Sequence, residues 1–320
     1  MQQFISKSKN LVVLTGNAHS RLAANICEHL QIPIGKSVTS RFSDGEIFTE
    51  IQQNVRGCEV FVVQPTCAPA NDNLFELLIM IDALKRASAA EITAVLPYFG
   101  YARQDRKVAP RTPISAKLIS DLLSTAGATR VLSIDLHAGQ IQGFFNIPFD
   151  HIFGMPILLD HMRQHYHGKD LVIVSPDAGG TERARAYAKR LHAQIAMIDK
   201  RRERANISQV MNVVGDVQGK IAILLDDIVD TAGTLVNAAD ALKSRGALEV
   251  VAYATHGVLS GKAIDRLMQS SIQKLVVTDT IPQDKNLSLC PKLEVLTVAP
   301  LLAEAIRRIH VGESVSSLFV

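Results

Sequence analysis

Short apolar runs rich in valine, isoleucine and leucine recur along the chain, and turn-forming residues bound each of them. They are long enough for a strand and too short for a helix, so they predict buried β-strands. The runs lie at residues 11–16, 59–65, 92–100, 130–137, 171–177, 195–200, 220–227, 249–257, 274–280 and 293–300. Buried strands in this number require a sheet that other elements cover.

Helical patterns separate these runs. Residues 180–193 and 233–247 repeat apolar positions at helical spacing, and Gly246 follows two basic residues, as is usual where a helix ends. Residues 73–89 carry a further pattern, with apolar side chains three and four residues apart at Leu74, Leu77, Leu78, Ile81 and Leu84. Strands that alternate with helices predict an α/β fold in which helices cover both faces of a mainly parallel sheet.

The length of 320 residues favours two domains over one. Residues 130–145 resemble residues 220–235, because each segment is a strand followed by acidic residues and a glycine-containing loop. We therefore expect two similar α/β domains, 1–150 and 151–320. A final segment of roughly 20 residues is a candidate to pack back on the first domain.

Composition excludes several classes of function. The chain is 47% hydrophobic and 20% charged, and its formal net charge of +3 is too weak to indicate nucleic acid as a partner. No apolar stretch approaches the roughly 18 residues of a membrane span, and the N-terminal apolar run is too short for a signal peptide. The four cysteines form no CxxC pair, so we expect reduced thiols and a cytoplasmic protein.

The strongest chemical signal lies at residues 220–234. Asp226 and Asp227 end a predicted strand, and paired carboxylates are suited to accept hydrogen bonds from vicinal hydroxyls. The turn from Asp230 to Thr234 offers backbone N–H groups and hydroxyls to an anion at the start of a helix. A phosphate cradle beside a diol binder describes a ribose 5-phosphate site. The alternative is a helix capped by Asp230 or Thr231, with two solvated acids.

Two further strands end in polar clusters. Asp177, Gly179 and Gly180 suit a pyrophosphate or metal site, although a tight turn explains the same residues. Asp135 and His137 are two residues apart, so both side chains can point to one side. A lone histidine is more often structural, and Mg²⁺ prefers oxygen, so contact of His137 through water or with phosphates stays open.

Two polar loops complete the set of candidates. Lys200, Arg201, Arg202 and Arg204 follow a strand and form either a solvated basic loop or a mobile lid over a polyphosphate. Residues 42–46 offer an aromatic ring and two carboxylates to a nucleotide, and residues 103–104 offer an arginine and a glutamine. Neither of these last two segments is specific by itself.

Taken in order, these segments resemble the PRPP synthetases (ribose-phosphate diphosphokinases) of the phosphate-activated class. The resemblance rests on VLLDDIVDTAGT-type residues at 223–234, here ILLDDIVDTAGT, and on motifs that span nearly the whole chain. These motifs are FSDGE at 42–46, KRASAAEITAVLPYFGYARQDR at 85–106, SIDLHAGQIQGFF at 133–145, VSPDAGG at 174–180, IDKRRERAN at 198–206 and SVSSLF at 314–319.

The resemblance implies two phosphoribosyltransferase-like domains and a transferase that moves the pyrophosphoryl group of Mg-ATP to O1 of ribose 5-phosphate, giving PRPP and AMP. It implies that Lys200 and Arg202 are catalytic lid residues. His137 and Asp177 are implied as ligands of the cofactor Mg²⁺, with Asp135 as a further candidate. The implied ATP contacts are Phe42, Asp44, Gly45, Glu46, Arg103 and Gln104. The implied ribose 5-phosphate contacts are Arg202, Asp226, Asp227, Asp230, Thr231, Ala232, Gly233 and Thr234.

The same resemblance implies a homo-oligomer, as a hexamer, in which residues 42–46 reach the site of a neighbouring subunit. Phosphate as activator and ADP as inhibitor would share an anion site between subunits. Its implied contacts in this chain are Arg56, Lys107, Gln142, Ser314 and Ser316.

Two other functions compete with this interpretation. A phosphoribosyltransferase, which consumes PRPP, explains residues 220–234 but leaves the first half of the chain and the basic lid without a role. A non-catalytic partner or sensor is expected to have lost lid cations or acids, yet Lys200, Arg202, Asp177, His137 and Asp226 are all present.

We predict that activation by free phosphate is weaker in this chain than is typical of the class. Asn54 stands where the family often has serine, and Val108 lies where a polar residue is common. Pro110 replaces another serine, which removes both a hydroxyl and a backbone N–H. Each lost hydrogen bond to a charged group weakens binding by roughly 1.5–3 kcal/mol. Activity measured against phosphate concentration at fixed ionic strength tests this, and a steep phosphate requirement of the usual kind would contradict it.

Overall fold

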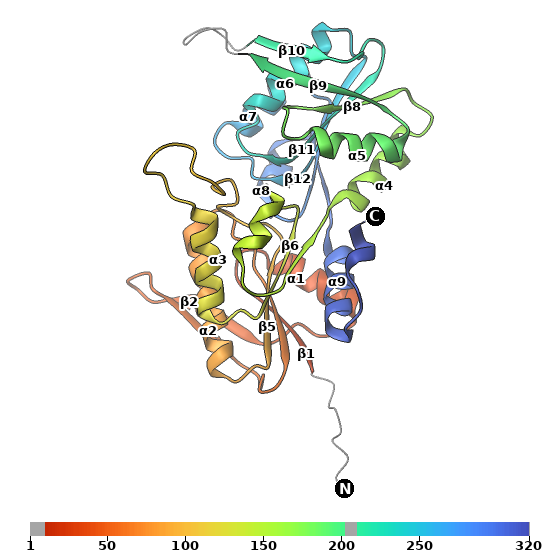
Figure 1. Cartoon of the computed structure of the whole chain (residues 1–320). Helices are drawn as coiled ribbons and strands as arrows, with labels where there is room; N and C mark the ends of the chain where they lie inside the picture. The colour runs from red at the N-terminus through yellow and green to blue at the C-terminus, as the bar shows by residue number, and fades with distance from the viewer. Residues whose placement is uncertain (1–9, 202–209, 320) are drawn as a thin grey trace. The chain divides into compact units, whose positions relative to one another are not determined.

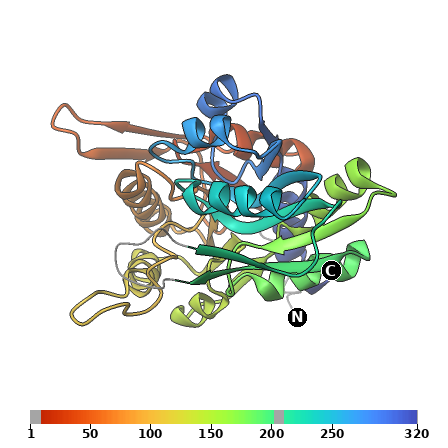
Figure 2. The same cartoon turned by 90° about the horizontal axis from the view of Figure 1, so that it is seen from above.

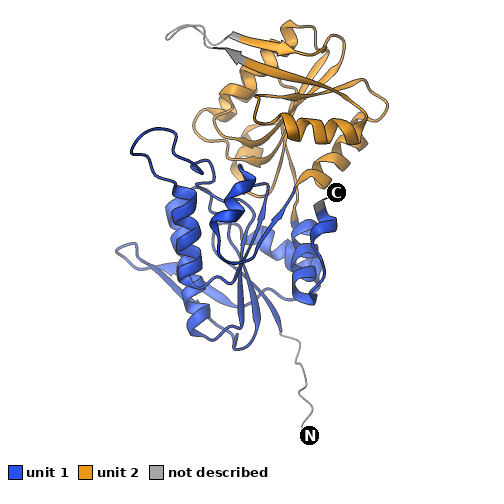
Figure 3. Ribbon diagram, viewed as in Figure 1, with its two compact units in different colours: residues 1–153, 299–320 blue, residues 154–298 orange. Residues whose placement is uncertain are grey.

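The computed structural model describes residues 10–201 and 210–319, and it divides into two compact units (Figure 3). Unit 1 comprises residues 1–153 and 299–320, and unit 2 comprises residues 154–298. Each unit contains a mainly parallel sheet with flanking helices, so the predicted α/β class is confirmed.

Unit 1 is built on a parallel sheet in the order β1-β4-β5-β6-β7. These strands are β1 (Leu11–Thr15), β4 (Glu59–Val63), β5 (Glu91–Leu96), β6 (Arg130–Ile134) and β7 (Phe149–Ile152). The helices are α1 (Ser20–Leu30), α2 (Ala70–Arg86), α3 (Ser115–Ala126), α9 (Ala299–Val311) and the 3₁₀ segments η1 (Gly139–Phe144) and η2 (Ser316–Phe319). The last helix, α9, packs beside α1, so elements from the two ends of the chain lie together in this unit (Figure 1).

Helix α2 shows how the apolar pattern becomes a buried face. Leu77, Ile81 and Leu84 are fully buried at four- and three-residue spacings, as predicted. The helix covers residues 70–86, so it begins before the predicted range of 73–89 and ends earlier, with Lys85 and Arg86 in its last turn. Basic residues at this end stabilise the helix dipole.

An antiparallel ribbon of β2 (Ser37–Arg41) and β3 (Ile47–Ile51) extends away from the rest of unit 1 (Figure 2). The sequence analysis did not predict these strands, because they have no continuous apolar run. Their side chains are half-buried or exposed throughout. The ion pair between Arg41, next to the turn of the ribbon, and Asp72 of α2, at 2.9 Å, ties the turn end of the ribbon to α2.

Unit 2 is built on a larger sheet in the order β10-β9-β8-β11-β12-β13-β14, in which only the pair of β10 and β9 is antiparallel. The strands are β8 (Leu171–Ser175), β9 (Gln194–Arg201), β10 (Val210–Val214), β11 (Ile221–Val229), β12 (Glu249–Gly257), β13 (Lys274–Thr278) and β14 (Leu293–Leu296). The helices are α4 (Met155–Tyr166), α5 (Thr181–Leu191), α6 (Gly233–Ser244), α7 (Ala263–Gln269) and α8 (Asp284–Leu289).

Strand β11 shows why this sheet needs helices on both faces. Ile221 and Ile223 belong to a buried cluster with residues of α4 and α5, whereas Ala222 and Leu224 belong to a second cluster with residues of α6 and α7. Successive side chains of a strand point to opposite faces, so an unbroken apolar run places apolar groups on both. Helix α6 ends at Ser244, and Gly246 follows with a φ of 87°, as predicted for a residue after a helix end.

All four cysteines are buried free thiols. Burial raises the pKa of Cys27 and of Cys67 to about 11, so both remain protonated and unreactive at neutral pH. Over the ranges 10–201 and 210–319, every helix is too short or too polar to cross a bilayer.

The backbone at Gly100 packs closely against Thr66, and we predict that Gly100→Ala destabilises unit 1. A Cβ atom there would lie 2.2 Å from the carbonyl oxygen of Thr66, whose Oγ1 accepts the Gly100 N–H at 2.7 Å. Two buried backbone segments must separate to admit the methyl group, at a cost of about 1–3 kcal/mol in the free energy of unfolding. Gly139→Ala is the control, because a Cβ at Gly139 meets nothing within 4 Å. Equal urea unfolding curves for the two variants would refute the prediction.

Candidate active site

Three of the predicted clusters meet at one edge of the unit 2 sheet. Strands β9, β8 and β11 are neighbours and run parallel (Figure 1), so their carboxyl ends lie side by side. Lys200 lies near the end of β9, Asp177 follows β8, and the acids Asp226 and Asp227 lie in β11. Ligands bind outside the carboxyl ends of parallel strands in open α/β sheets.

The two acids lie within a strand rather than at its end, which corrects the prediction. Strand β11 pairs with β8 only as far as Leu224, but its pairing with β12 continues to Val229. The strand therefore outlasts its neighbour β8, and Asp226 and Asp227 occupy the part that β8 no longer flanks. The sequence did not reveal this extension, because the apolar run stops where the acids begin.

Arg183, in the first turns of α5, holds the acid pair. Its Nη1 lies 3.0 Å from Oδ1 of Asp227 and 3.8 Å from Oδ1 of Asp226. Asp227 is buried, so this cation offsets a charge that solvent cannot reach. The sequence analysis missed Arg183. The available signal was an arginine near the start of the helix that follows the predicted pyrophosphate loop.

Ionisation of Asp226 is unfavourable beside Asp227. Burial and the adjacent Asp227 charge raise the pKa of Asp226 to about 7. The backbone N–H of Asp227 donates to Oδ1 of Asp226 at 2.9 Å, and Arg183 also favours the ionised form, but these contacts only reduce the shift. Asp226 is therefore poised between its neutral and ionised forms near physiological pH.

The turn after β11 leads into α6 with a backbone that suits an anion. Ala232 occupies the N-cap position with a left-handed φ of 59°, and its methyl group cannot cap the helix. The alternative of a helix capped by Asp230 or Thr231 is therefore wrong. The turn is held from outside instead, because Ser260 donates to Oδ1 of Asp230 at 2.5 Å and Arg266 donates to the Thr231 carbonyl at 2.8 Å. Helix N-termini of this kind attract phosphate.

The loop after β8 is a compact turn built on Asp177. Its Oδ1 accepts the N–H of Gly180 at 3.0 Å, and its carbonyl accepts the Ser175 hydroxyl at 2.6 Å. Glycine at position 180 leaves room for this turn, because a Cβ there would lie 2.8 Å from the Ser175 Oγ. The half-buried Asp177 carboxylate thus shapes the turn while lying at the same sheet edge as Asp226 and Asp227.

In unit 1, the loops after β5 and β6 bring together two other predicted clusters. Gln140 donates to Oδ2 of Asp105 at 2.8 Å, which links the two loops. Gln104 accepts the Ser115 hydroxyl at 2.6 Å, so it is held against the start of α3, while its neighbour Arg103 is exposed. Asp135 has a φ of 39° directly after β6, and His137 is exposed two residues on.

The loop at residues 42–46 is held by contacts of its own ribbon. Asp44 accepts the N–H of Glu46 at 3.1 Å, and Arg41 donates to the Gly45 carbonyl at 3.1 Å. Phe42 is 54% exposed and packs edge-on against Phe48. The ribbon and the loop after β5 extend from different parts of unit 1 (Figures 1 and 2).

The predicted effector residues are exposed side chains of unit 1. They lie in the turn after β3, the loop after β5, η1 and the C-terminal segment: Arg56, Lys107, Gln142, Ser314 and Ser316. The predicted basic loop falls outside the described part of the chain: the side chains of Lys200 and Arg201, whose backbones belong to β9, and the whole of Arg202 and Arg204.

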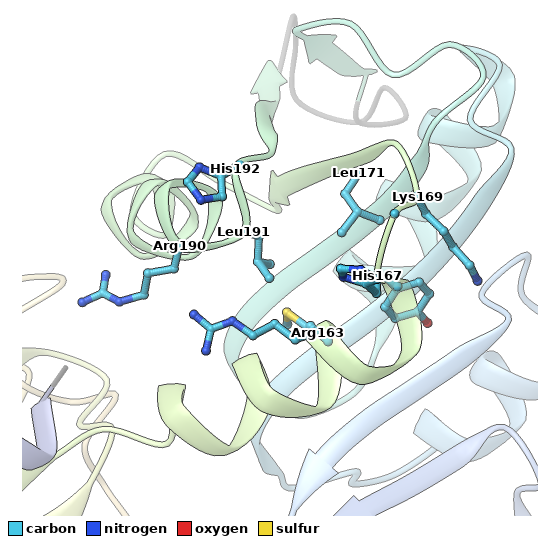
Figure 4. Close-up of a pocket in the computed structure, with 10 residues that line it drawn as sticks. Arg163, His167, Lys169, Leu171, Arg190, Leu191 and His192 are labelled. Atoms are coloured by element: carbon cyan, nitrogen blue, oxygen red, sulfur yellow. The ribbon is translucent and has the colours of Figure 1, made fainter.

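A cavity of about 450 Å³ lies elsewhere in unit 2, at the C-terminal ends of α4 and α5 (Figure 4). Its charged lining residues include Arg163, Lys169 and Arg190, and it contains none of the predicted site residues. Basic side chains are favourable at helix C-termini, which accounts for the charge of this cavity without a ligand.

Comparisons with known proteins agree with the sequence resemblance. A family profile for the N-terminal domain of ribose phosphate pyrophosphokinase matches residues 11–127, and one for the phosphoribosyl synthetase-associated domain matches residues 205–320. The ribose-phosphate pyrophosphokinase of Caldanaerobacter subterraneus is 58% identical, covering 98% of each chain, and that of Xanthomonas campestris is 57% identical with the same coverage. The crystal structure of phosphoribosylpyrophosphate synthetase from Mycobacterium smegmatis is 45% identical with a TM-score of 0.90, covering 95% of this chain and 100% of its own.

We predict that Asp226→Asn stabilises the substrate-free protein above neutral pH. The folded state raises the pKa of Asp226 from 3.8 to about 7, so ionisation favours the unfolded chain and stability is lost as pH rises from about 4 to 7. Asparagine cannot ionise, so the variant avoids this loss. Its melting temperature relative to wild type should rise across that window and then level off. A difference that is constant from pH 4 to 8 would rule out this account.

Proposed function

The chain belongs to the ribose-phosphate pyrophosphokinase family, and on that premise we propose that the carboxyl edge of the unit 2 sheet binds ribose 5-phosphate. The chain is a transferase that moves the pyrophosphoryl group of ATP to O1 of ribose 5-phosphate, giving PRPP and AMP. The observation that carries the site proposal is the acid pair held by Arg183 beside the uncapped start of α6.

Each part of the edge matches a part of the sugar phosphate. The carboxylates of Asp226 and Asp227 would accept hydrogen bonds from the vicinal ribose hydroxyls. The turn from Asp230 through Thr234 would hold the 5-phosphate with backbone N–H groups and hydroxyls at the start of α6. With both ends of the sugar fixed, O1 can be placed in line with the β-phosphorus of ATP, which is how phosphoryl-type transfers are accelerated.

The residues present fit Mg²⁺ as the cofactor. Asp177 supplies a carboxylate at the edge where polyphosphate is expected, and carboxylate oxygens are the ligands that Mg²⁺ prefers. His137 and Asp135 of unit 1 are the other proposed contacts, with the imidazole suited to contact through water. When bound, the ion would neutralise polyphosphate charge.

Basic side chains of the protein would neutralise the remaining negative charge of the polyphosphate. Lys200 and Arg202 are proposed to neutralise negative charge as the bond between the α- and β-phosphates breaks, and Arg202 also to contact the sugar phosphate. In unit 1, Arg103 and Gln104 are proposed to bind ATP. The exposed ring of Phe42 and the carboxylates of Asp44 and Glu46 are proposed to contact adenine.

The function is tested by incubating the protein with ATP, Mg²⁺ and ribose 5-phosphate. We expect AMP and PRPP to form in equal amounts. A phosphoribosyltransferase would leave ATP intact and consume PRPP, and a non-catalytic partner would form no AMP. The full-length match to pyrophosphokinases already argues against both alternatives.

We also propose a homo-hexamer in the cytoplasm, with phosphate and ADP as effectors at Arg56, Lys107, Gln142, Ser314 and Ser316. The four free thiols support a reducing compartment. The separation of the ribbon loop from the loop after β5 supports a role for residues 42–46 in the site of a neighbouring subunit.

We predict that Lys200→Ala keeps the fold and lowers the turnover number by about 10²-fold or more, because one preorganised charge stabiliser is lost. The variant Lys189→Ala is the matched control, since Lys189 is an exposed lysine of α5 in the same unit. Near wild-type turnover of Lys200→Ala with both substrates saturating would reject the lid role.

We predict that Phe75→Glu weakens assembly of the oligomer. Phe75 in α2 and Leu118 in α3 are each 58% exposed on neighbouring helices, and Leu122 is exposed one turn after Leu118, so several apolar side chains face solvent on these two helices, as is typical of interfaces between proteins. Light scattering should give a hexamer for wild type and smaller species for the variant. Leu248→Glu, at an exposed apolar position of unit 2, is the control. A fully active wild-type monomer would end the oligomer proposal.

A further inference from the structure

Two histidines and a glutamate converge on the surface of unit 2, away from the acid pair. His161 and His165 are one turn apart on α4, and Glu294 lies on the edge strand β14. One nitrogen or oxygen of each residue lies within 4.8 Å of the others. The two imidazole rings are stacked, with centroids 3.9 Å apart, because residues i and i+4 share a helix face.

Hydrogen bonds orient both imidazoles as metal ligands are usually oriented. Nδ1 of His165 lies 2.9 Å from the carbonyl oxygen of His161. A carbonyl only accepts, so Nδ1 carries the proton and Nε2 is the nitrogen with an available lone pair. In His161, Nδ1 lies 2.9 Å from the Tyr253 hydroxyl. Histidine ligands typically hydrogen-bond through their second nitrogen, which fixes the orientation of the ring.

The carboxylate is positioned as well. Lys274 donates to Oε2 of Glu294 at 2.6 Å, and Oε1 of Glu294 lies 3.0 Å from Nε2 of His161. Lys274 thus restrains one oxygen while the other points at the imidazole. Burial lowers the pKa of His161, which favours the neutral imidazole, the form that binds metals.

We propose that His161, His165 and Glu294 bind one first-row transition-metal ion of the Zn²⁺ type, with water completing its coordination. Two imidazoles and one carboxylate suit such an ion, whereas Mg²⁺ prefers oxygen ligands alone. The site is therefore separate from the magnesium chemistry of the reaction. The bound ion would tie α4 to β14 across the edge of the sheet.

The metal-free geometry needs little change to admit the ion. Ligand bonds of about 2.0–2.2 Å place neighbouring donor atoms about 3–3.5 Å apart, and Nε2 of His161 is already 3.0 Å from Oε1 of Glu294. In the free state this nitrogen donates to Glu294 and Nδ1 accepts from Tyr253. On binding, the proton moves to Nδ1, which then donates to the Tyr253 oxygen, so no net proton is released. The donor atoms of the three residues already lie within 4.8 Å of one another, so a small shift of the exposed His165 ring completes the set.

The test uses untagged full-length protein without nucleotide, titrated with Zn²⁺ in a calorimeter in the presence of excess Mg²⁺, which occupies oxygen-rich sites. We expect one Zn²⁺ per chain. We also expect a rise in melting temperature of about 5 °C or more at Zn²⁺ concentrations near one hundred times the dissociation constant. His165→Ala and Glu294→Gln should each weaken the affinity about 10-fold or more.

His167→Ala is the matched control. His167 is an exposed histidine just after the same helix and lines the neighbouring cavity (Figure 4), but it does not belong to the cluster. It should bind Zn²⁺ as wild type does. Circular dichroism checks that the variants are folded, which is expected because His165 is exposed. The proposal is overturned if wild type binds no Zn²⁺, if His165→Ala or Glu294→Gln binds it unchanged, or if His167→Ala loses it.

Discussion

Parallel pairing of β9, β8 and β11 is the constraint on which the rest of the candidate site depends. Parallel strands must all end at the same edge, and the helices that connect them must begin there. The acids of β11, the Asp177 turn after β8 and the first turns of α5 and α6 therefore meet without any local signal that directs them to one another. The edge thus combines carboxylates, which can accept from hydroxyl groups, with helix N-termini, which attract anions, as the proposed ribose 5-phosphate site requires.

The chemistry of that edge comes from ionisable groups placed where water is scarce. Asp226 is largely buried beside Asp227, and the two share the Arg183 guanidinium, so Asp226 is poised between its neutral and ionised forms near neutral pH. Such perturbed groups are common at functional sites, because burial and like charge make them respond strongly to an incoming ligand. The cluster of His161 and Glu294 differs, since Tyr253 and Lys274 hold the far nitrogen and oxygen of these side chains, and a metal ion would replace only the hydrogen bond between His161 and Glu294.

Unit 1 presents its candidate residues in another way. Its ribbon and its long loops hold themselves by local hydrogen bonds, such as that from Glu46 to Asp44, and leave aromatic and basic side chains at the surface. They are therefore suited to present side chains such as Phe42 to a nucleotide or to another subunit, whereas unit 2 builds its site from the sheet itself.

The sequence by itself determined the α/β class, the position of the main strands and the face that α2 buries, because apolar periodicity follows directly from the geometry of strands and helices. It also indicated Asp226, Asp227 and the turn into α6 as candidate site residues, because these residues lie close together in the sequence. Only the tertiary structure decided that β11 continues past its acids, that Arg183 holds them, and that His161 meets Glu294. Arg183 and Asp227 are 44 residues apart in the sequence, and His161 and Glu294 are 133 residues apart. Apolar periodicity carries no information about which distant polar side chains the fold will bring together.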